Sequence, residues 1–217
     1  ADLAVESEAE AFEAIRGFLS YLPSNCQEPL PVVETDDPVE RVSEKLLDIV
    51  PANLRKPYDI REVIAVISDK GSVFEIKPTY AANIVTSFAR LNGKPVGFIA
   101  NQPMRMAGML DAKACEKSAH FIALCDAYGL PLIFLVDVPG FSIGSAAENS
   151  GLGRRSGRVF YELSHATVPR ISIILRKGYG AGYFAMAGGR SFNADACVAW
   201  PTAEICAMSV EGAVDVA

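Results

Sequence analysis

The chain has 217 residues, a net charge of −6 and a sequence pI of about 5.0, and half of its residues are hydrophobic. This length allows one well-packed core, or one domain joined to a piece of another. An acidic chain without a basic cluster of interleaved aromatic residues is not expected to bind nucleic acid. No apolar run reaches the roughly 18 residues of a membrane span, and no secretory leader is recognisable. We therefore expect a cytoplasmic protein with no membrane partner.

The cysteines predict free thiols. Their number is odd and no pair has the C-x-x-C spacing, which favours buried thiols in a reducing compartment. The five are Cys26, Cys115, Cys125, Cys197 and Cys206. The two histidines, His120 and His165, do not stand at ligand spacing from any of them, so we expect no bound metal.

A capping box predicts a helix over residues 7–20 at the amino end. Ser7 and Glu10 occupy the N-cap and the third helical position. The expected apolar stripe consists of Phe12, Ile15, Leu19 and Leu22. The polar, proline-broken segment that follows has the composition of a linker. Within it, Asp37-Pro38 predicts the start of a second short helix. The side chains expected to face inward there are Val39, Val42 and Leu46.

Residues 57–128 contain the signals of a helix, three strands and a longer helix. Tyr58-Asp59 predicts a helix that ends at Gly71, with Ile60, Val63 and Ile67 on one side. The expected strands are residues 73–76, 84–91 and 95–100. The last two flank Asn92-Gly93, which is the strongest short-range signal of a hairpin. A helix over 111–128 then begins at Asp111 and ends before Gly129.

The second half of the chain alternates strands and helices. Strands are expected at residues 132–137, 171–176 and 197–200. Helices are expected at about 153–166 and 181–188. Continuous apolar strands that alternate with helices indicate an α/β fold with a parallel sheet.

Two glycine-rich turns stand out because each follows an apolar strand. Residues 138–141 read Val-Pro-Gly-Phe, and residues 176–183 read Arg-Lys-Gly-Tyr-Gly-Ala-Gly-Tyr. Small residues at the carboxyl end of a parallel strand leave backbone N–H groups unblocked where such sheets place ligands, and these donors suit an oxyanion. The alternative is a tight connection in which the glycines serve packing alone. A phosphate loop is excluded, because Lys177 precedes the glycines instead of following them.

Side-chain catalysis has weaker candidates. Asp137 ends a buried strand, and we interpret it as a structural cap of the following turn. Ser164-His165 lack the G-x-S-x-G context of a hydrolase nucleophile, and His120 is expected to be packed within its helix. Glu148 is expected to be solvated in a polar loop and Glu204 to cap a helix. No convincing pair of carboxylates is present for a hydratase.

Seven stretches, in order and spread over nearly the whole chain, carry a family resemblance. They are LSYLP (19–23), PYDIREVI (57–64), IANQP (99–103), LVDVPGF (135–141), ATVPRI (166–171), RKGYGAGY (176–183) and AWPTA (199–203). Through them the chain resembles the carboxyltransferase (beta) subunit of biotin-dependent acyl-CoA carboxylases, in the crotonase/ClpP-like superfamily.

The resemblance implies a crotonase-like (ClpP-like) spiral of repeated strand–strand–helix units, with two related domains per subunit. Residues 1–22 would be the carboxyl-terminal helix of a first carboxyltransferase domain. Residues 23–56 would be a linker with a short helix, and residues 57–217 a second domain that is truncated at its end. Active sites would form between the first domain of one subunit and the second domain of its partner, in an oligomer that the resemblance implies is hexameric. The 217-residue piece alone is therefore expected to be inactive.

The resemblance also implies a chemistry that needs no side-chain nucleophile. Carboxybiotin would donate its carboxyl group to the α-carbon of an acyl-CoA, so that a biotin oxyanion and an enolate both need stabilising. The N–H groups of Ala181 and Gly182, in the turn that begins at Gly180, would serve the biotin oxygen. Further residues that would border biotin are Pro139, Gly140, Phe141 and Tyr183. The implied partners are biotin carboxylase and a biotin carboxyl carrier subunit.

Some positions depart from the family pattern. The turn reads Gly180-Ala181-Gly182, the order of the branched-acyl type, where propionyl- and acetyl-type relatives carry Gly-Gly-Ala. Phe184 follows, at a position that tunes the choice of acyl group in relatives. Residues 142–150 are rich in serine and alanine where relatives carry a Gln-Glu pair, of which Glu148 keeps the acidic member. The substrate stays open between acetyl-, propionyl- and methylcrotonoyl-CoA. A biotin-dependent decarboxylase subunit and a non-catalytic assembly subunit remain alternatives.

Overall fold

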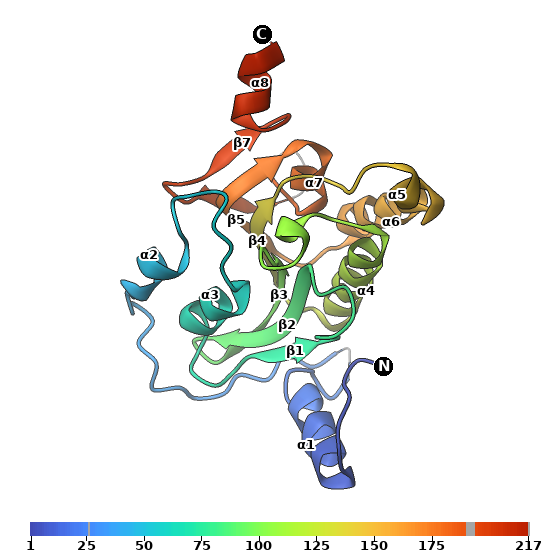
Figure 1. The fold of residues 1–217 in the computed structure, drawn as a ribbon. Helices are drawn as coiled ribbons and strands as arrows, with labels where there is room; N and C mark the ends of the chain where they lie inside the picture. Colours follow the sequence, from blue (N-terminus) through green and yellow to red (C-terminus); the bar gives the residue numbers. More distant parts are fainter. Residues whose placement is uncertain (26, 190–193, 217) are drawn as a thin grey trace.

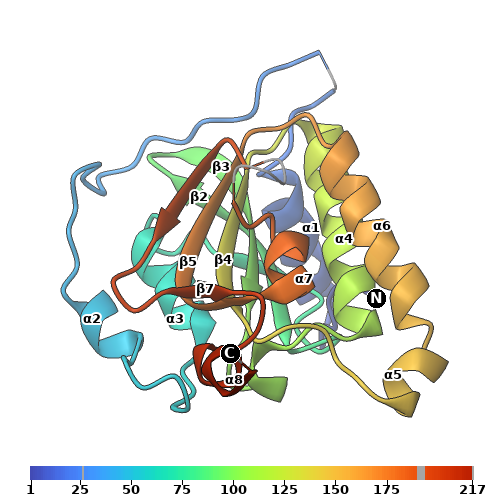
Figure 2. The ribbon, with the colours of Figure 1, turned by 90° about the horizontal axis from the view of Figure 1, so that it is seen from above.

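A seven-stranded mixed sheet forms the centre of the fold, with helices on both faces (Figures 1 and 2). The computed structural model describes residues 1–25, 27–189 and 194–216. The sheet order is β1-β2-β3-β4-β5-β6, and β7 also pairs with β5. The strands are β1 (Phe74–Ile76), β2 (Ile84–Leu91), β3 (Lys94–Asn101), β4 (Leu132–Val138), β5 (Arg170–Tyr179), β6 (Ala196–Ala199) and β7 (Glu204–Cys206). Strands β1 to β3 are antiparallel neighbours, and every pairing from β3 onward is parallel.

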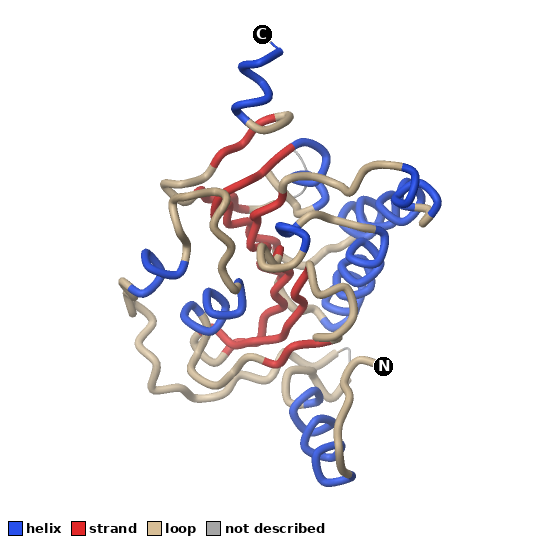
Figure 3. The backbone as a smooth tube through the Cα atoms, in the orientation of Figure 1, coloured by secondary structure: helices blue, strands red, loops and turns tan. Residues whose placement is uncertain are grey.

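The helices divide between the two faces of the sheet. They are α1 (Glu8–Leu19), α2 (Lys45–Ile49), α3 (Ile60–Ile67), the 3₁₀ turn η1 (Met106–Gly108), α4 (Ala112–Tyr128), α5 (Ser145–Asn149), α6 (Leu152–His165), α7 (Gly180–Ala185) and α8 (Val210–Val216). Figure 2 shows α4 and α6 along one face and α3 on the other, while Figure 3 shows the strands enclosed between these layers. Among the described residues, no helix is long and apolar enough to cross a membrane.

The period-2 alternation of the central strands builds one core on each face. Phe134 and Val136 of β4 belong to the core under α4 and α6, whereas Ile133 and Leu135 belong to the core under α3. Because all four side chains are almost completely buried, β4 must be apolar along its whole length. This explains the continuous apolar run that predicted the strand.

The structure confirms the hairpin turn and the ends of α4 that local sequence signals predicted. Asn92 and Gly93 both have positive φ, at 52° and 76°, as the two-residue hairpin turn requires. The Asp111 carboxylate accepts the Ala114 N–H at 2.8 Å and caps α4. Gly129 ends that helix in the left-handed conformation.

A buried arginine fastens α1 and the linker to the sheet. Arg90 of β2 donates to the carbonyl oxygens of Ser20 at 2.6 Å, Pro31 at 2.9 Å and Gly93 at 3.0 Å. Its guanidinium also lies 4.8 Å from the centre of the Tyr21 ring. One cation therefore joins the end of α1, the linker and the β2–β3 hairpin.

The apolar stripe of α1 lies on the surface of this chain. The helix and its Ser7 cap form as predicted, and Leu22 is buried. The exposed fractions of the other stripe residues are 58% for Phe12, 53% for Ile15 and 57% for Leu19.

Several sequence predictions of element bounds are wrong. No helix starts at Asp37-Pro38, because the Asp37 carboxylate instead binds the Arg41 guanidinium, which also donates to Val66 O and Ser68 O. Of the side chains expected to face inward, Val39 and Val42 are 76% and 90% exposed and Leu46 is half-buried. The short helix of this region is α2, which begins only at Lys45.

Two further ends differ from the prediction: α3 ends at Ile67 instead of Gly71, and β5 continues to Tyr179 instead of ending at Arg176. Helices α5 and α8 and strand β7 had no sequence prediction.

Candidate functional site at the carboxyl ends of strands four and five

The two glycine-rich turns meet because β4 and β5 are parallel neighbours. Val138 pairs with Gly178 at the ends of these strands. A Cβ on Gly182 would lie 2.9 Å from the Gly140 Cα and 3.0 Å from Val138 Cγ2. The backbones of the two turns are thus in direct contact.

The turn after β4 is held in place by a neighbouring segment. The Leu110 N–H donates to Gly140 O at 3.0 Å, and the Ser142 N–H donates to Leu110 O at 2.8 Å. Gly140 has a φ of 138°, which favours glycine. Beyond it, the half-buried Phe141 lies with its ring centre 6.5 Å from that of Phe160 on α6. These contacts fix the wall that residues 139–141 present to the second turn.

The turn after β5 starts α7. Tyr179 has extended backbone, Gly180 has a φ of 55°, and helical geometry follows at once. The first N–H groups of a helix have no acceptor within the helix, and the side chain of the N-cap residue, Tyr179, makes no capping hydrogen bond. Ala181 is exposed and Gly182 is buried against the Gly140 turn. The arrangement can therefore offer backbone donors to a negatively charged oxygen.

The aromatic residues after the turn pack beneath it. The buried Tyr183 ring lies where Cβ atoms on Gly178 or Gly188 would collide with it, at 2.9 and 2.3 Å. Its hydroxyl lies 3.8 Å from Cys197 Sγ, and burial raises the pKa of Tyr183 to about 12. Phe184 is half-buried, with its ring centre 5.6 Å from that of Tyr183. Tyr183 therefore supports the turn from its core side.

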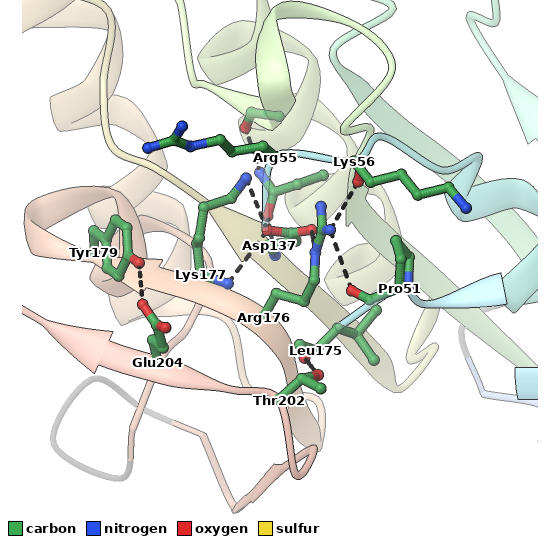
Figure 4. A network of polar contacts seen from close by, with 12 residues as sticks. Pro51, Arg55, Lys56, Asp137, Leu175, Arg176, Lys177, Tyr179, Thr202 and Glu204 are labelled. Carbon is green, nitrogen blue, oxygen red and sulfur yellow. Dashed lines mark hydrogen bonds and ion pairs between the residues drawn. The ribbon is translucent and has the colours of Figure 1, made fainter. Parts of the chain in front are cut away.

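The sequence analysis did not predict a buried network of charged side chains, which lies near the ends of β4 and β5 (Figure 4). Asp137 is completely buried, and its carboxylate accepts the Arg176 Nε–H at 2.8 Å and the Lys177 backbone N–H at 3.2 Å. The interpretation of Asp137 as a structural residue holds, but it anchors an ion pair between strands instead of capping its own turn. The only sequence signal was the basic pair Arg176-Lys177, which is adjacent to Asp137 once the strands are paired.

Of the other polar candidates, Glu204 lies beside the second turn, where β7 pairs with residues 177–179 of β5, and the rest lie on helices α4, α5 and α6. His120 is exposed on α4, so the prediction that it is packed is wrong. Ser164 bonds to carbonyls of its own helix, and His165 is exposed at the end of that helix. Glu148 is exposed as predicted, but on α5 and not in a loop. Glu204 lies in β7 and accepts the Tyr179 hydroxyl at 2.5 Å, so it does not cap a helix.

The sequence predicted that the cysteines are buried thiols, and this holds for two of the four that the structure describes. Cys115 and Cys125 are buried, whereas Cys197 and Cys206 are half-buried; Cys26 lies outside the described residues. Within residues 1–25, 27–189 and 194–216, no group of three His, Cys, Asp or Glu side chains gathers in a way that would hold a metal ion.

Comparison with known proteins gives the family. The family model for the carboxyl transferase domain matches residues 1–217. The chain belongs to the carboxyl transferase domain family. It is 46% identical over 216 residues to the carboxyltransferase subunit of propionyl-CoA carboxylase of Haloferax mediterranei, and 45% identical over 216 residues to the alpha subunit of methylmalonyl-CoA decarboxylase of Veillonella parvula. Each match covers all of this chain and 42% of the relative.

A solved structure extends the comparison to the fold. The carboxyl transferase chain superposes on transcarboxylase 12S with a TM-score of 0.95 and 45% identity, over 99% of this chain and 41% of that one. That structure is described as a hexamer assembly with methylmalonyl-coenzyme A bound. The fold is therefore crotonase-like, as the resemblance implied. The chain spans about two-fifths of the length of these relatives.

Proposed function

We propose that the full-length protein transfers a carboxyl group from carboxybiotin to the α-carbon of an acyl-CoA of the acetyl-, propionyl- or methylcrotonoyl-type. The observation that carries this proposal is the contact between the β4 and β5 turns, beside the start of α7, whose first N–H groups have no acceptor within the helix. Membership of the carboxyl transferase domain family supports it.

The proposed site uses backbone groups. The N–H groups of Ala181 and Gly182 donate to the ureido oxygen of biotin, and Gly180 provides the sharp turn that starts the helix. When bound, biotin carries the carboxyl group, and its ureido oxygen gains negative charge as that group leaves. Residues 139–141 border the biotin ring, and the absence of a Cβ on Gly140 and Gly182 lets the two turns lie close together. Tyr183 holds the turn from behind.

The remaining parts of the site come from beyond this chain. We infer that residues 1–22 end a first carboxyltransferase domain, that residues 23–56 link it to a second domain, and that residues 57–217 are most of that second domain. The acyl-CoA enolate is then stabilised by the first domain of a partner subunit in a hexamer. Biotin carboxylase and a biotin carboxyl carrier are the proposed partners in the cytoplasm. The exposed apolar stripe of α1 supports this division, because such a surface normally packs against another part of a protein.

A second candidate is the reverse reaction. The chain is nearly as similar to the methylmalonyl-CoA decarboxylase subunit of Veillonella parvula as to the Haloferax mediterranei propionyl-CoA carboxylase subunit. The same donors would stabilise the same charge in either direction. Assays of the full-length protein with its carrier decide between them: net carboxylation of propionyl-CoA favours the first function, and activity confined to malonyl-type CoA with free biotin favours the second.

The proposal is tested by removing one donor with little steric change. Ala181 is the second residue of α7 and is exposed, and proline is tolerated in the first turn of a helix, where it removes only the N–H. We expect Ala181→Pro in the full-length protein to lower kcat about 100- to 1000-fold, the usual effect of losing one oxyanion donor. Ala181→Gly, which keeps the N–H, should retain activity.

The matched control is Ala9→Pro. Ala9 is also the exposed second residue of a helix, α1, and lies far from the turns in the fold (Figure 1). It should leave kcat unchanged. Equal activity of the Ala181→Pro variant and wild type, with both proteins folded, would refute the donor role and leave the assembly-subunit alternative.

A further inference from the structure

Strand β5 bulges opposite Asp137, at the point where the site begins. Val136 pairs with Ile174, but Val138 pairs with Gly178, so β5 advances four residues while β4 advances two. Surplus residues of this kind bend a strand and redirect the chain beyond it. The surplus segment contains Arg176 and Lys177, and the position of Gly178 and of the turn behind it depends on how this segment is held.

The segment is held by a buried ion pair. The side chains of Asp137 and Arg176 are 0% and 1% exposed, and their Oδ2 and Nε atoms are 2.8 Å apart. The other oxygen of Asp137 accepts the Lys177 backbone N–H at 3.2 Å and lies 3.4 Å from Lys177 Nζ. A buried ion pair contributes little net stability compared with apolar residues of similar volume. The pair nevertheless holds the bulged backbone directly, because the Asp137 carboxylate also accepts the Lys177 backbone N–H.

The far side of Arg176 binds the linker. Its Nη1 donates to Asn53 O at 2.9 Å and to Lys56 O at 2.8 Å. The guanidinium also lies 4.7 Å from the centre of the Tyr58 ring. Figure 4 shows Arg176 between Asp137 on one side and the linker carbonyls on the other. One side chain therefore joins the end of β4, the bulge of β5 and residues 53–58.

Asp137 is itself fixed from the other side. Its backbone N–H donates to Asn101 Oδ1 at 3.2 Å, and Asn101 Nδ2 donates to Gly108 O at 3.0 Å. Asn101 is completely buried at the end of β3. The backbone of Asp137 is therefore held in place, and the carboxylate of Asp137 in turn sets the position of the bulged segment of β5.

We propose that Asp137 and Arg176 are positioning residues for the turn over 180–183, and that Arg176 couples residues 53–56 of the linker to that turn. They hold the bulge so that the N–H groups of Ala181 and Gly182 face one point beside Gly140. The kinetic part of this inference rests on the proposed carboxyl transfer. The structural part, that the turn is ordered by this pair, does not.

The test variant in the full-length protein is Arg176→Lys. Lysine keeps a positive charge beside Asp137 but cannot reach the carboxylate and the two linker carbonyls together, because it lacks the planar fork of donors. We expect kcat to fall by about 100-fold, as for a displacement of about 1 Å in a positioned group, with little change in KM for acyl-CoA. Hydrogen exchange of the amides in residues 178–184 should be faster than in wild type.

The matched control is Lys117→Met. Lys117 is also a buried cation, and its Nζ donates to three carbonyl oxygens, those of Lys77, Tyr80 and Ile84, none of them in either turn. Its loss should destabilise the protein while leaving kcat and the exchange of residues 178–184 unchanged below the melting temperature. If Arg176 served stability alone, Arg176→Lys would behave like Lys117→Met: the protein would be less stable, but kcat and the hydrogen exchange of residues 178–184 would not change.

A second variant keeps the inference testable if Arg176→Lys does not fold. Asp137→Asn preserves shape and removes the charge, and the same loss of kcat and faster exchange are expected. Wild-type exchange at residues 178–184 in whichever of these variants folds would overturn the proposal. If the wild-type protein transfers no carboxyl group, the proposed function fails, and the exchange measurement still decides whether the pair orders the turn.

Discussion

Replacing Gly93 with alanine is expected to displace the linker from the hairpin that it crosses. Gly93 has a φ of 76°, and a Cβ there would lie 1.9 Å from Val33 O. Ordinary contacts begin near 3.4 Å, so the linker must move by about 1.5 Å. The hydrogen bond from the Val33 N–H to Gly93 O, 3.1 Å long, cannot survive this shift.

The expected loss of stability has three contributions. A left-handed φ costs alanine roughly 1–2 kcal/mol, the broken hydrogen bond about 1 kcal/mol, and the collision roughly 1–3 kcal/mol. Gly93→Ala should therefore destabilise the protein by about 3–6 kcal/mol. Gly129→Ala is the matched control: Gly129 has a φ of 74° and no atom within 4 Å of a built Cβ. Gly129→Ala should therefore destabilise the protein only by the cost of a left-handed φ for alanine.

The assay is urea unfolding of the full-length variants, followed by limited proteolysis. Besides the larger loss of stability, Gly93→Ala should expose the chain to cleavage between residues 23 and 35, because the linker is no longer seated. Arg90 also binds this segment through Pro31 O, so partial protection is expected to remain. Equal destabilisation of the two alanine variants, without new cleavage in the linker, would refute the reasoning.

Two further predictions concern the thiols and the acyl pocket. Burial raises the pKa of Cys115 to about 12 and the pKa of Cys125 well above its usual value, so at pH 8 both thiols stay protonated. Mass spectrometry after iodoacetamide treatment should find them unlabelled in the native protein and labelled in urea; native labelling would contradict their burial. Phe184→Ala should raise the ratio of kcat/KM for longer over shorter acyl-CoA substrates by about 10-fold, since one methylene in a pocket is worth at least that much. An unchanged ratio across a panel of acyl-CoA substrates would exclude Phe184 as a specificity residue.

The elements that the sequence predicted well are those with local causes. The hairpin turn needs only Asn92-Gly93, whose positive φ values no other common pair adopts as readily. Helix α4 carries its own cap and its own stop, Asp111 and Gly129. The sequence also predicted that each glycine-rich turn follows an apolar strand, and the structure shows that these two strands are adjacent and parallel.

The elements that the sequence did not predict depend on distant partners. Asp37-Pro38 has the pattern of a helix start, but Arg41 binds Asp37 together with the end of α3 and holds the segment in another conformation. Strand β5 continues past Arg176 because β7 supplies pairing for residues 177–179. The ion pair of Asp137 and Arg176 joins residues 39 positions apart, and nothing in either local sequence indicates that the two side chains are partners.

The edges of the sheet have a consequence for aggregation. Unpaired strand edges are templates on which other chains can add strands. Here one edge is β1, with three residues, and the other is formed by β6 and β7, with four and three residues. The long apolar strands are all interior in the order of the sheet, although β1 pairs with β2 only at residues 86–88. In the part of the chain that the structure describes, the strands at the edges of the sheet are therefore short, and the long apolar strands β3, β4 and β5 can serve as templates for fibril growth chiefly in chains that have not yet assembled the sheet.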